Sequence, residues 1–375
     1  MSSPVGLYLH VPFCAGKCPY CDFYSLSPSP GQMDRYQKRM EELLALWGRR
    51  LGRRAATVYF GGGTPSLLGA GRLSRLLEAA GEAFGILPGA EITCEVNPGS
   101  VNREFFRDLR AGGFNRISLG MQSALPEELR LLGRKHRVED VAHAVEYARS
   151  AGFQNLSLDL MLALPGSTLQ SLERSIAFAA GLEPEHLSAY LLKIEPGTPF
   201  ARRELVLPDE DGQAGQYLFA VEALERLGLC QYEISNFARP GFESRHNLIY
   251  WLRGEYFGLG PGAHSFYGGQ RFYWPRDLEG FLQGGQPLPE GDPISPKEAM
   301  EEYAMLRLRL SRGLDQAECR EAFAAAGDAL FRQIFANARR CPAYCFRENN
   351  IRRISLSPEG FLVSNALLGR LLDKL

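Results

Sequence analysis

The sequence lacks several features that would place the protein in a membrane, in the secretory pathway or on nucleic acid. No apolar run approaches the ~18 to 20 residues that a membrane-spanning helix needs. The first residues, Met-Ser-Ser-Pro-Val-Gly, lack the basic and then apolar regions of a signal peptide. The formal net charge is only −1, so no excess of positive charge indicates a nucleic-acid partner. We therefore expect a cytoplasmic protein with no transmembrane segment.

Cysteine is also scarce, and its distribution is informative. Three of the eight cysteines, Cys14, Cys18 and Cys21, lie close together, and no fourth cysteine follows nearby in the sequence. Structural zinc sites and ordinary iron–sulfur clusters usually take four protein ligands. A cluster held by three cysteines keeps one iron open to an outside ligand, which indicates a working site. The pattern favours an iron–sulfur cluster; zinc with His10 or a distant residue as fourth ligand is the alternative.

Apolar, β-prone runs recur along the first half of the chain, with helical segments between them. The expected strands are 6–11, 56–60, 91–96, 116–120, 155–160 and 186–192, and the expected helices include 33–51, 72–84 and 103–111. Alternating strands and helices at this spacing predict an α/β fold with a parallel sheet and helices outside it. Six such units would form a partial, open (β/α)6 barrel.

The second half of the chain changes character. A helix is expected at 209–227 and a further strand at 232–237, before a stretch rich in glycine and aromatic residues. Beyond Ser295 we expect helices at 301–310 and 315–325. A hairpin of 351–356 with 361–364 would complete a small winged-helix-like domain. The predicted division is 1–237 for the barrel, 238–294 for a connecting section and 295–375 for the C-terminal domain.

Glycines and polar residues gather where the expected strands end. The run Gly-Gly-Gly-Thr-Pro at 61–65 closes the second strand, and glycine lets a backbone approach a ligand closely. Glu95, Gln122 and Asp159 end the next three strands. In parallel α/β folds this edge of the sheet carries the ligands. We predict a binding site here; the alternatives are a tight turn and polar residues that face solvent.

Five motifs resemble the HemN/HemW branch of the radical S-adenosylmethionine (SAM) superfamily. They are Tyr-x-His-x-Pro-Phe-Cys, Gly-Gly-Gly-Thr-Pro, Glu-Val-Asn-Pro, Gly-Met-Gln-Ser and Leu-Asp-Leu-Met-x-x-Leu-Pro-Gly. The similarity covers nearly the whole chain. It implies a [4Fe–4S] cluster on the three cysteines, whose open iron binds SAM. It further implies that the SAM site is lined by Tyr8, Tyr20, Gly62, Gly63, Thr64, Glu95, Gln122, Arg134 and Asp159.

Two features separate the two families of this branch. HemN enzymes, which are oxygen-independent coproporphyrinogen III oxidases, usually carry a cysteine where this chain has Phe23. His246 begins the sequence His-Asn-Leu-Ile-Tyr-Trp, which resembles the motif that marks HemW haem chaperones and is linked there to haem binding. A neutral imidazole is a good axial ligand for haem iron. The resemblance therefore implies a haem chaperone with haem, an acceptor protein and an electron donor as partners, and leaves open whether the protein is also an enzyme.

Two other functions stay open at this point. One is radical decarboxylation of a porphyrinogen, as in HemN, and the other is radical SAM chemistry on an unrelated substrate without haem. His246 could instead cap a loop beside two core aromatics. Relatives often have cysteine at the position of Ser244. If that cysteine helps to hold haem in them, this protein must bind haem more weakly or through other residues. Further residues considered are His264 as a second haem ligand, Cys94 and Cys230 as core residues, and Cys341 with Cys345 as a metal or redox pair or as incidental cysteines.

Overall fold

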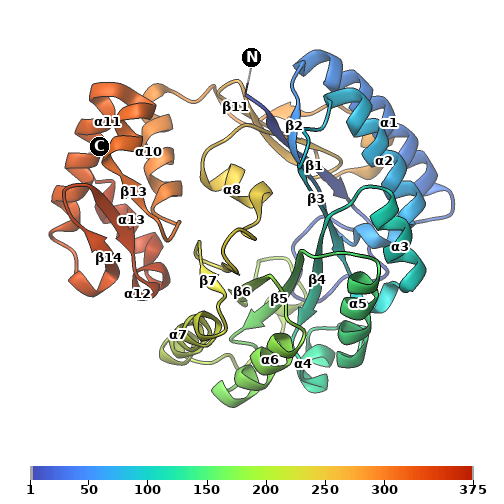
Figure 1. Cartoon of the computed structure of the whole chain (residues 1–375), viewed down its shortest axis with the longest axis horizontal. Helices are drawn as coiled ribbons and strands as arrows, with labels where there is room; N and C mark the ends of the chain where they lie inside the picture. Colours follow the sequence, from blue (N-terminus) through green and yellow to red (C-terminus); the bar gives the residue numbers. More distant parts are fainter. Residues whose placement is uncertain (1–2, 374–375) are drawn as a thin grey trace.

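A computed structural model describes residues 3–373, which form one large sheet, one small sheet and the helices around them (Figure 1). Six parallel strands follow one another in chain order at the centre of the large sheet. They are β1 Val5–Val11, β2 Ala55–Gly62, β3 Glu91–Val96, β4 Arg116–Gln122, β5 Leu156–Leu162 and β6 His186–Leu191. The predicted partial (β/α)6 barrel is confirmed.

Helices follow the strands and cover the outer side of the curved sheet (Figure 1). They are α1 Gln32–Leu51, α2 Gly69–Phe84, α3 Arg103–Ala111, α4 Pro126–Leu131, α5 Val138–Ser150, α6 Leu169–Gly181 and α7 Glu210–Arg226, with short 3-10 turns at Pro65–Leu68, Pro98–Ser100 and Phe200–Arg202. Because side chains alternate across a strand, Val58 and Phe60 of β2 join the apolar core beneath the helices. In residues 3–373 no helix is long and apolar enough to cross a membrane.

The large sheet extends beyond the barrel on both sides. Beyond β6 come β8 Asn236–Ala238 and β7 Cys230–Gln231; beside β1 come β9 Tyr256–Leu259, β10 His264–Tyr267, β11 Gln270–Tyr273 and β12 Leu288–Pro289. The single strand expected at 232–237 is wrong. The chain turns there because the buried Glu233 carboxylate accepts hydrogen bonds from the Ser235 N–H and the Asn236 side chain.

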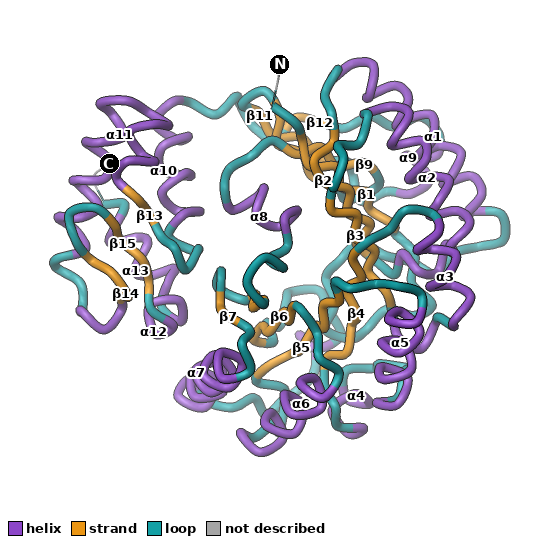
Figure 2. Tube along the Cα trace, in the orientation of Figure 1, coloured by secondary structure: helices purple, strands orange, loops and turns teal. Residues whose placement is uncertain are grey.

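A short helix, α8 Arg245–Trp251, lies on the concave side of the sheet, opposite the outer helices (Figure 2). The Glu91 carboxylate of β3 accepts the N–H groups of Arg245 at 3.0 Å and His246 at 2.9 Å. The Ser244 hydroxyl caps the helix by accepting the Asn247 N–H. A carboxylate and a serine cap satisfy N–H groups that a helix start otherwise leaves unpaired. Together they fix α8 inside the barrel.

The C-terminal domain packs helices on a small antiparallel sheet of order β13-β15-β14, as the winged-helix-like prediction requires. Its elements are α10 Pro296–Arg307, β13 Leu314–Asp315, α11 Gln316–Ala338, a 3-10 turn at Ala343–Cys345, β14 Phe346–Asn349, β15 Arg353–Leu356, α12 Pro358–Leu362 and α13 Ser364–Leu371, and a further short helix, α9 Leu278–Leu282, precedes the domain. The predicted hairpin partner of β15 is wrong. Ser357 caps a helix by accepting the Gly360 N–H, so 361–364 is helical and β14 pairs with β15 instead.

Close packing of α1 on α2 gives a prediction about stability. A Cβ atom at Gly48 would lie 2.4 Å from the Ala83 carbonyl oxygen, whereas one at Gly81 would meet only Ile86 at 3.8 Å. We expect Gly48→Ala to lower the free energy of unfolding by about 1 to 2 kcal/mol through overpacking. Gly81→Ala, the matched control, should raise it by about 0.5 to 1 kcal/mol. Denaturant unfolding measures both, and equal changes of the same sign would contradict the packing argument.

Candidate functional site

The three cysteines lie on a loop that leaves the end of β1 and returns to it. The Cys14 N–H donates to the Leu26 carbonyl and the Leu26 N–H to the Pro12 carbonyl, each at 3.0 Å, which closes the loop. Inside it, the Cys21 N–H donates to the Cys18 carbonyl at 3.1 Å. All three thiols are free and partly exposed. The loop therefore offers three soft ligands, the donor set that an iron–sulfur cluster needs.

Within residues 3–373, no group of three or more His, Cys, Asp or Glu side chains is arranged to hold one metal ion. In a four-iron cluster each cysteine binds a different iron, so its ligands do not converge on one point. Both ring nitrogens of His10 are engaged, Nδ1 with the Tyr8 hydroxyl and Nε2 with the Tyr24 carbonyl, each at 3.0 Å. Because a carbonyl only accepts, the proton lies on Nε2. His10 therefore braces this region and does not point a free nitrogen at the cysteines.

The glycine-rich loop after β2 is joined to the cysteine loop by main-chain hydrogen bonds. The Gly63 N–H donates to the Val11 carbonyl at 2.8 Å, and the Thr64 N–H donates to the Phe13 carbonyl at 2.7 Å. The Thr64 hydroxyl lies 3.3 Å from the Cys14 sulfur. A Cβ atom at position 63 would lie 2.6 Å from the Phe13 oxygen, so only glycine permits this approach.

Arg134 lies between α4 and α5, after β4, and approaches the cysteine loop. Its Nη2 donates to the Gly120 carbonyl at 2.8 Å, and its Nη1 lies 3.9 Å from the Cys18 sulfur. Its Nε is buried and has no partner in the described chain. A small pocket here is lined by residues that include Cys18, Thr64, Asn97 and Arg134. A guanidinium with free donor capacity beside a thiol suits a bound carboxylate.

Two predicted carboxylates face the inside of the barrel. Glu95 accepts from the Tyr59 hydroxyl at 2.8 Å and from the Gly62 N–H at 3.1 Å. Burial raises the pKa of Glu95 to about 7, the bond from Tyr59 opposes the shift, and the charge of Asp159 adds to it. Burial likewise raises the pKa of Asp159 to about 6, against a hydrogen bond that Ser118 donates at 3.3 Å. Both acids are placed to attract a cation when ionised.

Gln122, Tyr8 and Tyr20 complete the predicted set. Gln122 has a φ of 67°, which is uncommon outside glycine and is often found at functional sites. Its side-chain oxygen accepts from the Tyr190 hydroxyl at 2.9 Å. Tyr20 packs on Phe200, with ring centroids 6.2 Å apart. Short contacts join Thr64 to Cys14, Glu95 to Gly62 and Arg134 to Cys18, whereas Tyr20 packs on Phe200 outside the predicted set.

His246 lies on α8 and is buried, with 1% of its surface exposed. Its Nδ1 pairs with the Thr57 hydroxyl and its Nε2 with the Tyr250 hydroxyl, each at 2.7 Å. Its ring stacks on Tyr59 at a centroid distance of 5.0 Å. Burial lowers the pKa of His246 to about 3, with the charge of Arg116 adding to the shift. The imidazole is therefore neutral, as haem ligation requires, but both nitrogens are already in use.

The remaining candidates are spread over the molecule. His264 is exposed and pairs with Glu290 at 3.2 Å. Cys94 is buried as expected, but Cys230 is exposed, so its assignment to the core is wrong. Cys230 lies in a two-residue strand at the outermost edge of the large sheet, which leaves its side chain exposed. Cys341 is partly exposed, and Cys345 is buried in the C-terminal domain.

Sequence reasoning missed several residues that hold this site together, including Tyr59, Ser118 and Tyr190. The alternation of polar and apolar residues in the strands could have found them, because positions two apart share one face of a sheet.

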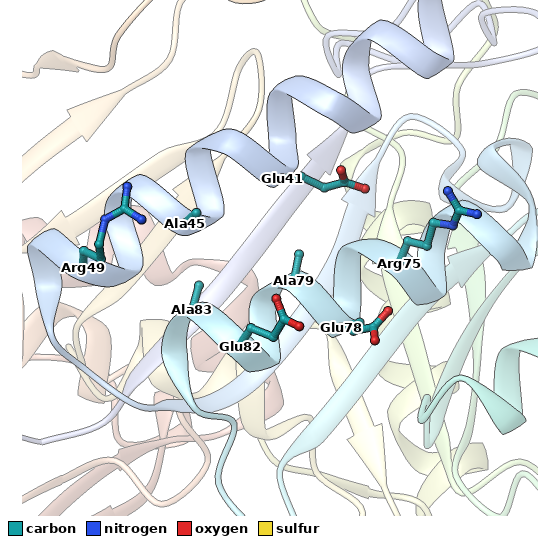
Figure 3. Close-up of a pocket in the computed structure, with 8 residues that line it drawn as sticks. All are labelled: Glu41, Ala45, Arg49, Arg75, Glu78, Ala79, Glu82 and Ala83. Carbon is teal, nitrogen blue, oxygen red and sulfur yellow. The ribbon is translucent and has the colours of Figure 1, made fainter.

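A separate hollow lies on the outer side between α1 and α2, away from the cysteines (Figure 3). Charged side chains and alanines line it, among them Glu41, Arg49 and Arg75.

Two family models match this chain. The model of the radical SAM superfamily matches residues 8–179, and that of the HemN C-terminal domain matches residues 294–363. Among solved structures, the coproporphyrinogen III oxidase HemN from Escherichia coli has a TM-score of 0.86 at 23% identity and covers 99% of this chain and 91% of its own. That likeness shows the shared fold.

Curated relatives are closer in sequence. A protein from Mycobacterium tuberculosis named heme chaperone HemW is 40% identical over 84% of each chain. Proteins of the same name from Escherichia coli and Bacillus subtilis are 37% and 33% identical, over 84% and 98% of this chain and 85% and 99% of their own. This chain therefore belongs to the HemW family of the radical SAM superfamily.

Proposed function

We propose that this protein is a haem chaperone that binds a [4Fe–4S] cluster, SAM and haem and transfers haem to an acceptor protein in the cytoplasm. The observation that carries the proposal is the identity of 33% to 40% with proteins named heme chaperone HemW. Phe23 supports it, because HemN-type oxidases usually have cysteine there. Phe23 is 65% exposed on the cysteine loop.

Cys14, Cys18 and Cys21 would hold the cluster, and the open iron would take the amino and carboxylate groups of SAM. When bound, the cluster supplies an electron for cleavage of SAM, so an electron donor is a further partner. The guanidinium of Arg134 would pair with the SAM carboxylate. Glu95 and Asp159 would accept hydrogen bonds from SAM and balance its positive charge.

Haem ligation by His246 requires one of its nitrogens to become free. The hydrogen bond to Tyr250 is the easier one to break, because Tyr250 is partly exposed and lies one turn along the same helix. Thr57, in contrast, is buried in β2 with 1% of its surface exposed. We therefore assign Nε2 as the iron ligand, with Nδ1 kept in place by Thr57.

The first test concerns the cluster. Cys14→Ala, Cys18→Ala and Cys21→Ala should each abolish the four-iron cluster after anaerobic reconstitution, because a missing thiolate leaves a second iron without protein ligation. Iron and sulfide content with the visible absorbance measures this. Cys230→Ala, at an exposed cysteine, is the control and should keep the cluster. Unchanged iron and sulfide in all three loop variants would refute the cluster assignment.

The second test concerns SAM. Arg134→Ala and Asp159→Ala should weaken SAM binding by about tenfold to a hundredfold, the usual range for losing a charged hydrogen-bond partner. Their iron content should stay at the wild-type level. Calorimetric titration of the reconstituted protein measures the affinity, with Arg130→Ala on the exposed face of α4 as control. Wild-type affinity in both site variants would reject the proposed pocket.

The third test concerns haem and is a titration followed by absorbance. His246→Ala should weaken haem binding or shift its spectrum, whereas Tyr250→Phe should preserve or strengthen it because Nε2 is freed. His143→Ala, at an exposed histidine of α5, is the control. If the wild-type protein binds no haem specifically, the chaperone proposal fails, and anaerobic porphyrinogen decarboxylation with SAM becomes the activity to assay.

A further inference from the structure

Arg116 is a charged side chain enclosed inside the barrel, with only 2% of its surface exposed. In the described chain no carboxylate forms an ion pair with it within 4.0 Å, and its Nε is buried without a hydrogen-bond partner. A guanidinium does not lose its proton in proteins. A buried charge without compensation is strongly destabilising. Charges at somewhat longer range must therefore balance Arg116.

The sheet places one acid on each of the two strands that flank β4, at the level of Ser118, two residues further along β4 than Arg116. Arg116 and Ser118 share the inner face of β4, because they are two residues apart. Ser118 is the register partner of Glu95 on β3, and it donates a hydrogen bond to Asp159 on β5 at 3.3 Å. One cation thus lies on the strand between two carboxylates.

Four other ionisable groups near Arg116 carry no charge at neutral pH. They are Tyr59 on β2, His186 on β6, Tyr232 after β7 and His246 on α8. Burial lowers the pKa of both histidines and raises the pKa of both tyrosines. The Glu91 carboxylate is occupied by the N–H groups at the start of α8. Tyr8 on β1 lies near Glu95. Arg134, which contacts the cysteine loop, lies near Asp159.

We propose that Arg116 is a positioning residue for the SAM site, whose buried charge keeps Glu95 and Asp159 ionised together. The inference rests on the proposed binding of SAM. When both are ionised, Glu95 and Asp159 place two negative charges on the inner face of the barrel. SAM carries a permanent positive charge on its sulfonium, which these carboxylates would attract.

The direction of the pH effect follows from the two acids. Burial raises the pKa of Glu95 to about 7 and that of Asp159 to about 6, and the charge of Arg116 works against both shifts. Removing that charge would raise both pKa values further, since like charges in one site oppose joint ionisation. A larger fraction of both Glu95 and Asp159 would then be protonated at neutral pH. SAM affinity would fall there and recover as the pH rises through the new pKa.

The experiment is a calorimetric titration of SAM into reconstituted protein from about pH 6 to about pH 9, for wild type, Arg116→Gln and Arg116→Lys. The affinity of the wild type for SAM should fall by up to about tenfold for each pH unit below the pKa of Glu95 or Asp159. In Arg116→Gln the midpoint of the fall in SAM affinity with pH should lie about one pH unit higher than in the wild type. The SAM affinity near neutral pH should then be about tenfold weaker than that of the wild type and should return at high pH. Arg116→Lys keeps the charge and should keep the midpoint.

Arg103→Gln removes an exposed positive charge and is the control for overall charge. A loss in Arg116→Gln that is the same at every pH, or no loss at all, would overturn the inference. If Arg116→Gln does not fold by circular dichroism, Arg116→Lys and the wild-type profile decide, and a wild-type affinity independent of pH would overturn it. Absence of SAM binding by wild type at every pH would overturn the proposed SAM site as well, which separates the two failures.

Discussion

The main-chain hydrogen bonds between the cysteine loop and the glycine-rich loop are the constraint on which the site depends. They join the ends of β1 and β2, which are neighbouring parallel strands. They form only because Gly63 has no Cβ atom to meet the Phe13 carbonyl. The three thiols and the predicted SAM loop therefore belong to one rigid unit. Such a unit satisfies the need of a cofactor site for ligands whose positions are fixed before binding.

The second constraint is the polar inner face of the barrel. The outer face of each strand is apolar because helices cover it, so the alternation of side chains leaves the inner face free to carry tyrosine, histidine, serine and acid residues. Burying these groups is costly unless each finds a partner. Tyr59 bonds to Glu95, and Tyr190 bonds to Gln122. These two hydrogen bonds hold Glu95 and Gln122, which are predicted to bind SAM, in place on the inner face of the sheet.

The strands, the outer helices and the position of most candidate residues could be predicted from sequence, because local periodicity and strand-end glycines report them. What local patterns could not report is pairing over long distances. β9 joins β1 although about 250 residues separate them in the chain, and α8 occupies the barrel because Glu91 accepts its first N–H groups. The error at 361–364 has a similar origin, since Ser-Pro-Glu-Gly suits both a turn and a helix start.

The position of α8 also means that the predicted haem and SAM sites share contacts. His246, the predicted haem ligand, stacks on Tyr59, and Tyr59 donates to the Glu95 carboxylate in the predicted SAM site. The same imidazole is held by Thr57, which lies on β2 together with Tyr59. A change in the position of His246 therefore acts on a strand that ends in the SAM loop. In this fold, the proposed haem ligation by His246 and the proposed SAM binding by Glu95 would not be independent, and a variant at one site is best measured at both.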